Sequence, residues 1–314
     1  MLRYLFKRIV QIPLVLFVVS LTIFGITRAT PGDPVQIMLG TQTSPEAVEA
    51  MRKEFNLDKP LPVQYVLWLG KVLSGDLGRS FRLNRPVTQL LAETLPISLK
   101  LALAAMAFAL LVSVPLGMLA ALKRNTWIDY LCTGYTVAGF AIPNFALALI
   151  LIYVFSIQLD WLPITGIGSS QNVGFWANFA PFILPAVALG TLQTAVFTRL
   201  LRGSMIDVLG QEYIRVARAK GLMPTTVVLV HALKNALIPF VTMVAIQFGY
   251  MIGIQVTIEY IFAIPGVGSA VLNAVVNRDF PVVQGFTLVV AGFFIMANMI
   301  ADMLYALLDP RIRY

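Results

Sequence analysis

The chain has 314 residues, of which 58% are hydrophobic and 12% are charged, and its formal net charge is +8. Soluble globular proteins contain about 45–50% apolar and about 25% charged residues. A soluble particle of this size could not cover its surface with so few charged side chains. The composition therefore excludes an ordinary soluble enzyme, a disordered protein and a coiled coil, and it indicates a protein solvated by lipid.

Six stretches are apolar over a length that could cross a membrane, which takes roughly 20 residues. They cover residues 9–27, 97–122, 130–159, 182–198, 237–258 and 282–304. We interpret the first as an uncleaved helix, because its apolar run is longer than the core of a signal peptide. The third contains Pro143, which removes a backbone hydrogen bond and predicts a kink.

The placement of basic residues predicts the orientation of these spans. An even number of spans leaves both termini on one side. Thirteen Lys and Arg residues lie in 1–8, 123–129, 199–236 and 306–314, against one in 160–181 and 259–281. Basic residues concentrate in short cytoplasmic loops, so we expect cytoplasmic termini. Segment 30–95, which has several prolines and charges of both signs, is then an external, water-exposed segment.

The basic stretch between the fourth and fifth spans has the pattern of two short helices. Ser204–Asp207 looks like a capping-box helix start, and apolar residues then recur at helical spacing. Gly221 predicts a left-handed corner that ends the first helix, Pro224 follows it, and a second helical stretch is predicted over Thr225–Asn235. A loop that only orients the chain is the alternative, but it needs no amphipathic helix and glycine corner, so we favour a docking surface for a cytoplasmic partner.

Side chains that commonly carry chemistry are scarce. One cysteine, Cys132, excludes a disulfide framework and a zinc ribbon, and one histidine, His231, excludes most histidine-based metal sites. The phosphate-binding pattern Gly-x-x-x-x-Gly-Lys-[Ser/Thr] is missing, since Val72 follows the nearest Gly70-Lys71 pair. An intramembrane protease is excluded because His231 and Ser269 are predicted on opposite sides of the membrane. We expect no enzyme activity, cofactor or metal in this chain.

Several motifs carry a family resemblance. Residues 212–221 (EYIRVARAKG), followed by 231–239 (HALKNALIP), resemble the cytoplasmic coupling loop of type I ABC importer permeases, and of the dipeptide/oligopeptide/nickel subfamily in particular. The subfamily's other motifs are GDLG at 75–78, IPNF at 142–145, WLP at 161–163, EYIFAIPGVG at 259–268, RDFP at 278–281 and DPR at 309–311. The resemblance covers nearly the whole chain.

The resemblance implies an all-α membrane protein with the type I ABC importer transmembrane fold, six spans and cytoplasmic termini. The expected parts are an N-terminal transmembrane helix (1–29), an external segment (30–95), a permease core with five transmembrane helices (96–308), cytoplasmic coupling helices within that core (203–236) and a cytoplasmic tail (309–314). The expected location is the cytoplasmic membrane, crossed several times.

The same resemblance implies a permease subunit of an ATP-driven importer of small solutes, with di- and oligopeptides favoured. The implied partners are a homologous second permease, two ABC ATPases that hold ATP and Mg²⁺, and an external solute-binding protein. Membrane lipid surrounds the spans, and nucleic acid is not an expected partner. The alternative is a stand-alone secondary transporter, which would usually show inverted repeats and buried ionisable groups.

Three groups of residues are the candidate functional positions. The resemblance implies ATPase coupling for Glu212, Tyr213, Arg215, Ala217, Arg218, Ala219, Gly221, His231 and Asn235. Gln247, Met251 and Gln255 are spaced four apart on one helix face, where they either hydrogen-bond between helices or line the pathway, which the resemblance favours. Glu259 at the outer end of the fifth span either contacts solute or binding protein, or pairs with a base such as Arg278.

Overall fold

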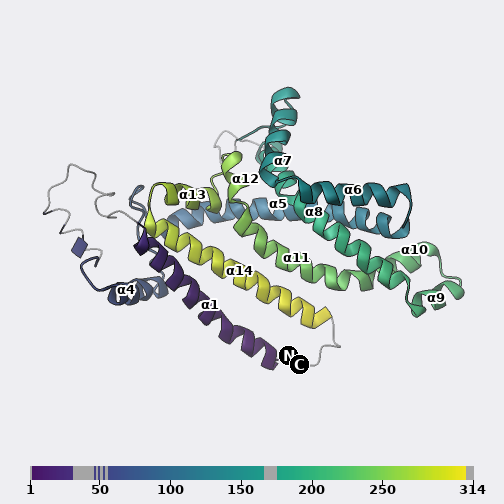
Figure 1. Ribbon diagram of the computed structural model, residues 1–314, viewed down its shortest axis with the longest axis horizontal. Coiled ribbons are helices and arrows are strands. Elements are labelled where there is room, and N and C mark those ends of the chain that lie inside the picture. The colour runs from purple at the N-terminus through teal and green to yellow at the C-terminus, as the bar shows by residue number, and fades with distance from the viewer. Residues whose placement is uncertain are drawn as a thin grey trace. The chain divides into compact units, whose positions relative to one another are not determined.

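The computed structural model describes residues 2–30, 46, 49, 52–53, 56–165 and 175–308. Within these ranges the chain is helical, and the one β-type pairing is the isolated bridge between Arg79 and Pro86 (Figure 1). The predicted all-α fold is confirmed. The predicted tail 309–314 and much of 31–55, in the predicted external segment, lie outside the described residues.

The described helices follow one another in chain order. They are α1 (Leu2–Ala29), α4 (Leu61–Leu73), α5 (Val87–Leu122), α6 (Trp127–Ala141), α7 (Asn144–Leu151) with a π-helical continuation (Ile152–Gln158), α8 (Phe175–Leu209), α9 (Glu212–Ala219), α10 (Pro224–Thr226) with a π-helical continuation (Val227–Leu233), α11 (Lys234–Ile254), α12 (Val256–Ile261), α13 (Val267–Val276) and α14 (Phe280–Leu308).

The described helices agree with the predicted number of membrane spans. Five stretches are long and apolar enough to cross a membrane, namely Val10–Ala29, Val87–Leu122, Asn178–Leu209, Pro224–Ile254 and Phe280–Met303. α6 and α7 meet at a bend of 103° and form a sixth span when the bent pair is counted as one. Pro143 lies at this bend as the extended residue before α7, which confirms the predicted kink in the third span.

The helices form two compact units. Unit 1 comprises Ser98–Ile264 and Met296–Tyr314, and unit 2 comprises Leu2–Ile97 and Pro265–Ile295. α5 and α14 each contribute one part to unit 1 and the other part to unit 2.

α8 is the central helix of unit 1 and packs against α6, α7 and α11 (Figure 1). Leu189, Phe197, Leu201 and Met205, spaced by multiples of four along α8, are fully buried. At Gly190 a Cβ atom would lie 2.7 Å from the backbone oxygen of Ala105 on α5. Helices in lipid associate through close packing of this kind, since hydrophobic burial gives little force between them.

The predicted helix start at Ser204–Asp207 is wrong. α8 continues through these residues to Leu209, and the next helix, α9, begins at Glu212 after the extended residue Gln211. Leu201 and Met205 are fully buried in unit 1, and this packing keeps the turn around Ser204 helical. Tertiary contacts commonly override a local signal of this kind.

Unit 2 is built on an apolar cluster from the start of α5, from α13 and from the start of α14. Its buried members are Val87, Leu90, Leu91, Val267, Ala274, Val282, Val283 and Phe286. α1 joins α14 where the Gln284 Nε2 donates a 2.7 Å hydrogen bond to Thr27 Oγ1. α4 packs on α1, with the Tyr65 hydroxyl 2.7 Å from Ser20 Oγ and its ring 5.4 Å from that of Phe24.

Two segments that lie 199 residues apart in the sequence meet in unit 2. Asp279, just before α14, accepts hydrogen bonds from Ser80 Oγ and, at 3.0 Å, from the backbone N of Phe81. The chain reaches this position through a tight turn at Gly75 and Gly78, whose φ angles of 86° and 85° suit glycine. The loop that follows the motif at 75–78 and the motif at 278–281 therefore form one structural joint.

Candidate functional site

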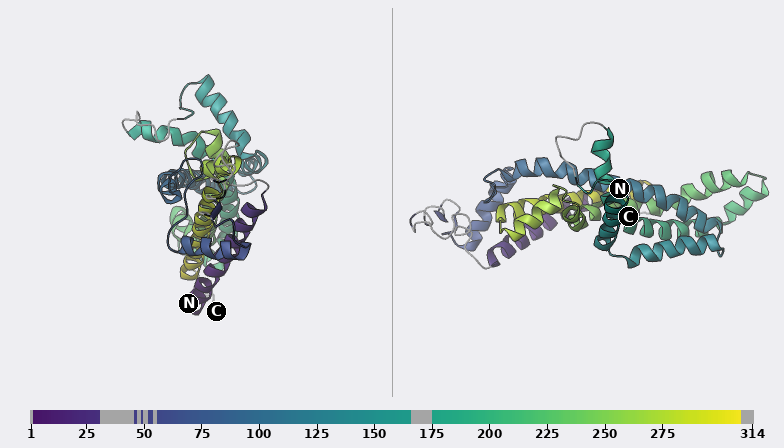
Figure 2. Two further views of the ribbon diagram at one scale, coloured as in Figure 1. Left: turned by 90° about the vertical axis from the view of Figure 1, so that its left-hand side faces the viewer. Right: turned by 90° about the horizontal axis from the view of Figure 1, so that it is seen from above.

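The predicted coupling segment folds as a short amphipathic helix followed by a glycine corner. Ile214 and Ala217 on α9 are buried, whereas Arg215 and Arg218 are exposed. Gly221 has φ 76°, as predicted, and no atom would clash with a Cβ there, so the backbone angle alone explains the need for glycine. α9 and the π-helical stretch 227–233 lie side by side (Figures 1 and 2).

Three of the predicted coupling residues come together between these two helical segments. The Asn235 Nδ2 donates a 3.0 Å hydrogen bond to the Tyr213 hydroxyl and a 2.9 Å hydrogen bond to the backbone oxygen of His231. These contacts tie α9 to the start of α11. Glu212 and Arg215 form an ion pair at 3.4 Å with both side chains largely exposed, so this pair adds little stability. Ala219 is also exposed.

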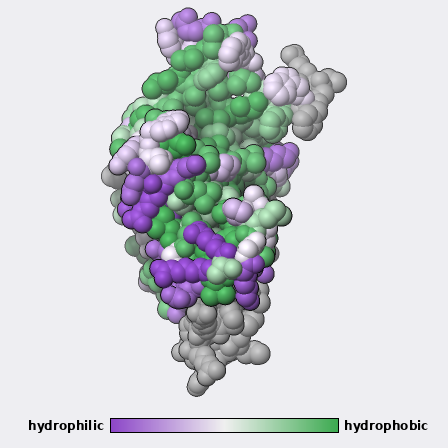
Figure 3. Space-filling model, turned by 90° about the vertical axis from the view of Figure 1, so that its right-hand side faces the viewer, coloured by the Kyte–Doolittle hydropathy of each residue, from purple (hydrophilic) through white to green (hydrophobic). Residues whose placement is uncertain are grey.

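The corner exposes apolar side chains beside its cations. Val216, Leu222, Met223, Leu229 and Val230 are all more than one-third exposed, and Arg218 and Lys220 are exposed near them. Figure 3, which views the molecule from the end where α9 and α10 lie in Figure 1, shows hydrophilic and hydrophobic side chains mixed on this face. Such a mixture suits a protein interface, where apolar contact and charge are both used.

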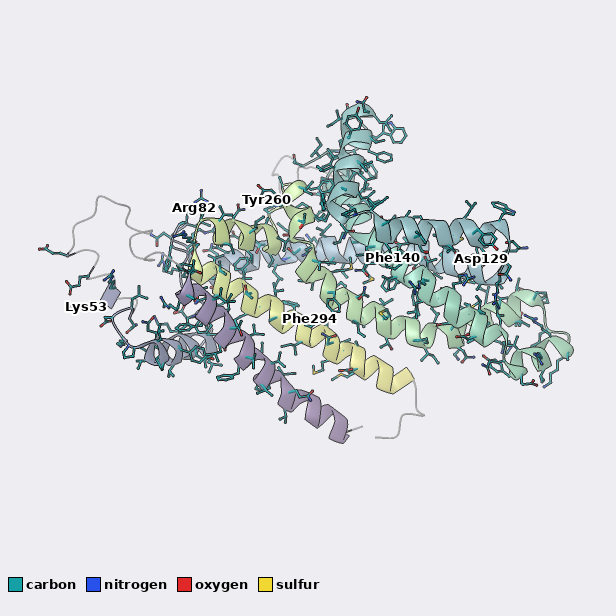
Figure 4. All side chains as sticks on the ribbon, in the orientation of Figure 1. Lys53, Arg82, Asp129, Phe140, Tyr260 and Phe294 are labelled. Atoms are coloured by element: carbon teal, nitrogen blue, oxygen red, sulfur yellow. The ribbon has the colours of Figure 1, made fainter. Side chains whose placement is uncertain are left out.

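Unit 1 contains a charged contact between α6 and α8 that the sequence did not predict. The Arg202 Nε and Nη2 donate to Asp129 Oδ1 and Oδ2 at 2.7 and 2.8 Å. Asp129, which lies in the first turn of α6 and is labelled in Figure 4, also accepts a 3.0 Å hydrogen bond from the backbone N of Asn125. The pair clamps α6 to α8, the helix that leads into α9. The available signals were an acid directly before the predicted third span, Asp129, and two arginines shortly after the predicted fourth span, Arg199 and Arg202.

The predicted pathway residues lie inside unit 1. The Gln247 Nε2 donates a 2.6 Å hydrogen bond to Oε1 of Gln193 on α8. Met251 and Gln255 are fully buried, and neither amide atom of Gln255 has a hydrogen-bond partner among the described residues. The Gln247 contact is the helix–helix hydrogen bond that the sequence left open as one interpretation, and pathway lining stays a prediction.

Glu259 is also fully buried and accepts a 2.6 Å hydrogen bond from Ser98 Oγ of α5. The contact joins α12 to α5 within unit 1. Its predicted role as an external contact stays a prediction. Within the described ranges, no three His, Cys, Asp or Glu side chains gather as a metal site would require.

Comparison with known proteins identifies the family. The family described as "Binding-protein-dependent transport system inner membrane component" matches residues 113–314, and "Binding-prot-dependent transport system membrane comp, N-term" matches residues 1–102. Together these matches cover nearly the whole chain.

Two curated relatives match along their full lengths. The chain is 39% identical over 312 residues to "Probable peptide ABC transporter permease protein y4tP" of Sinorhizobium fredii, covering 99% of each chain. It is 38% identical over 314 residues to "Glutathione transport system permease protein GsiC" of Escherichia coli K12, covering 100% of each.

A solved structure shares the fold at low sequence identity. The structure titled "Crystal structure of an amino acid ABC transporter with histidines" matches with a TM-score of 0.51 and 16% identity, over 72% of this chain and 95% of that chain. The family matches decide against the stand-alone secondary transporter. The chain belongs to the binding-protein-dependent transport system inner membrane components and is a multi-pass permease subunit of an ABC importer.

Proposed function

We propose that this permease subunit imports di- or oligopeptides together with a homologous second permease, two ABC ATPases that bind ATP and Mg²⁺, and an external solute-binding protein. The observation that carries the coupling role is the corner formed by α9, Gly221 and α10. It presents exposed apolar and basic side chains, and its buried face is fixed to the chain by Ile214 and Ala217.

The corner is also connected so that it can transmit movement. α9 follows α8 after two residues, and the helix from Pro224 to Ile254 runs without a break from the corner into the fifth span. A partner that moves the corner would therefore move two spans. The excess of basic residues in 1–8, 123–129, 199–236 and 306–314 supports a cytoplasmic position for this corner.

The peptide substrate is supported by the names of the two relatives, one a peptide permease and the other a glutathione permease. Glutathione is itself a tripeptide, so both names describe amide-rich solutes. We assign the pathway-lining role to Gln247, Met251 and Gln255. The unpartnered amide of Gln255 and the adaptable side chain of Met251 would suit weak contacts with many peptides once the helices that cover them separate. Glu259 is then an external-side contact.

The ATPase-docking role is tested by co-purification with the ATPases. We expect Arg218→Glu and Gly221→Pro to weaken recovery of the ATPases with the permease. Lys123→Glu is the matched control, because it reverses an exposed cation on the same predicted side outside the corner. Full recovery of the ATPases with both corner variants would contradict docking at this surface.

The transport role is tested in proteoliposomes that contain the complete complex and the binding protein, with a labelled dipeptide and labelled glutathione as probes. We expect ATP-dependent uptake of at least one probe, and no accumulation with this chain alone. Replacing both Gln247 and Gln255 by Leu should lower uptake without loss of assembly. Unchanged uptake kinetics would remove these glutamines from the pathway.

A further inference from the structure

Unit 2 contains a cavity of about 130 Å³ that is lined by the end of α1, by α4, by the turn after α4 and by the start of α14. By the same measure a single water molecule needs roughly 10–15 Å³, so the cavity can hold a larger group. Arg28, Lys71 and Arg79 line it, and Asp76 is the one acid among its described lining residues. The excess of cations favours an anionic group.

Two of the residues that line this cavity each have a buried polar atom without a hydrogen-bond partner among the described residues, namely Arg28 Nε and Gln64 Oε1. Gln64 is 7% exposed, and its Nε2 already donates a 2.7 Å hydrogen bond to the backbone oxygen of Lys59. This contact leaves Oε1 as a free acceptor. Buried polar groups are nearly always paired, so a ligand should offer both an acceptor and a donor.

The cavity lies where two membrane spans end. Arg28 is at the end of the apolar stretch Val10–Ala29, and Gln284 is near the start of the stretch Phe280–Met303. The hydrogen bond between Gln284 and Thr27 places these two ends side by side. The ends of apolar spans lie at the depth of the lipid headgroups, so the cavity lies at that depth as well.

The adjoining helix has an apolar exposed face. Val63, Val66, Leu67 and Leu73 of α4 are exposed, and the one charged residue of this helix, Lys71, lies one turn after Leu67. Trp68 of the same helix lines the cavity, and tryptophan is enriched at the membrane–water boundary. A short helix with an apolar face at this depth is typical of one that lies in the membrane interface.

We propose that unit 2 binds a membrane phospholipid at this place. The lipid phosphate contacts Arg28, Lys71 and Arg79, and the acyl chains cover the apolar face of α4. Gln64 Oε1 and Asp76 accept hydrogen bonds from a donor in the headgroup, which is an ammonium in phosphatidylethanolamine or a hydroxyl in phosphatidylglycerol. The role is separate from transport and does not depend on the identity of the solute.

The test is lipid binding to the purified full-length chain, measured by native mass spectrometry with lipids of identical acyl chains. Phosphatidylethanolamine and phosphatidylglycerol should be retained most strongly, phosphatidylcholine less because its headgroup has no donor, and diacylglycerol least because it lacks the phosphate. Glycerophosphoethanolamine, which has the headgroup without acyl chains, should compete poorly. Equal retention of all four lipids, or strong competition by the free headgroup, would overturn the proposal.

Variants localise the binding. Lys71→Gln changes an exposed side chain and should weaken phosphatidylethanolamine binding about fivefold, the effect of one basic residue at a membrane surface. Val66→Ser combined with Leu73→Ser should also weaken it, because the acyl chains lose apolar contact. Lys123→Gln, outside unit 2, is the matched control. Binding by Lys71→Gln that equals binding by Lys123→Gln would place the lipid elsewhere.

Discussion

Replacing Arg202 by Met should destabilise the protein, because the substitution leaves the Asp129 carboxylate buried without its cation. The Asp129 side chain is 4% exposed and that of Arg202 is 31% exposed. Removing one partner of a fully buried pair costs about 3–5 kcal/mol. Since water reaches part of Arg202 and the backbone N of Asn125 still donates to Asp129, we expect a loss of about 2–3 kcal/mol in the free energy of unfolding.

Substituting the other partner of the pair should cost less free energy of unfolding. Asp129→Asn leaves a partly exposed cation that water can solvate, and the amide oxygen can still accept one hydrogen bond, so we expect a loss of about 1 kcal/mol. The double variant should be more stable than the sum of the two losses predicts, because the two side chains interact directly. Arg199→Met is the matched control, since it removes an exposed Arg one turn earlier on α8.

The measurement is thermal unfolding of the purified full-length chain in detergent, followed by the loss of helical circular dichroism. The reasoning requires Arg202→Met to lower the midpoint by several degrees, and by more than Asp129→Asn or Arg199→Met. If the losses from Arg202→Met and Asp129→Asn simply added in the double variant, the two residues would not be coupled and the clamp between α6 and α8 would be refuted.

Three further predictions concern helix packing, the joint in unit 2 and the corner. Gly190→Ala should lower the free energy of unfolding by about 1–3 kcal/mol through overpacking, and the unfolding midpoint should fall with it. Gly203→Ala on the same helix, where no atom lies near the added Cβ, should leave the midpoint unchanged. Equal effects of the two variants would contradict the close approach of α8 and α5. Asp279→Ala should expose residues 79–85 to trypsin, because this loop loses its charged acceptor; unchanged cleavage would show that the loop is held by other contacts. Tyr213→Phe should weaken ATPase recovery by less than Arg218→Glu does, since it removes only the hydrogen bond from Asn235, and a larger effect would assign the hydroxyl to the interface itself.

The sequence alone determined those features that depend on short stretches of chain. Long apolar runs predict spans in any context, because lipid offers no hydrogen-bond partners and a helix pairs its own backbone N–H and C=O groups. Pro143 and Gly221 act through their own backbone geometry, so the bend in the third span and the left-handed corner could both be predicted. The helix start predicted at Ser204 failed because a capping pattern is weaker than the packing of Met205 in the core of unit 1.

Contacts between distant residues were decided only by the tertiary structure. Arg202 meets Asp129 across 73 residues, Ser98 meets Glu259 across 161, and Ser80 meets Asp279 across 199. No local pattern pairs such residues, because each partner is brought into place by the packing of helices from different parts of the chain. The sequence therefore determined which segments cross the membrane and where the chain turns, and the tertiary structure decided which polar side chains hold those segments together.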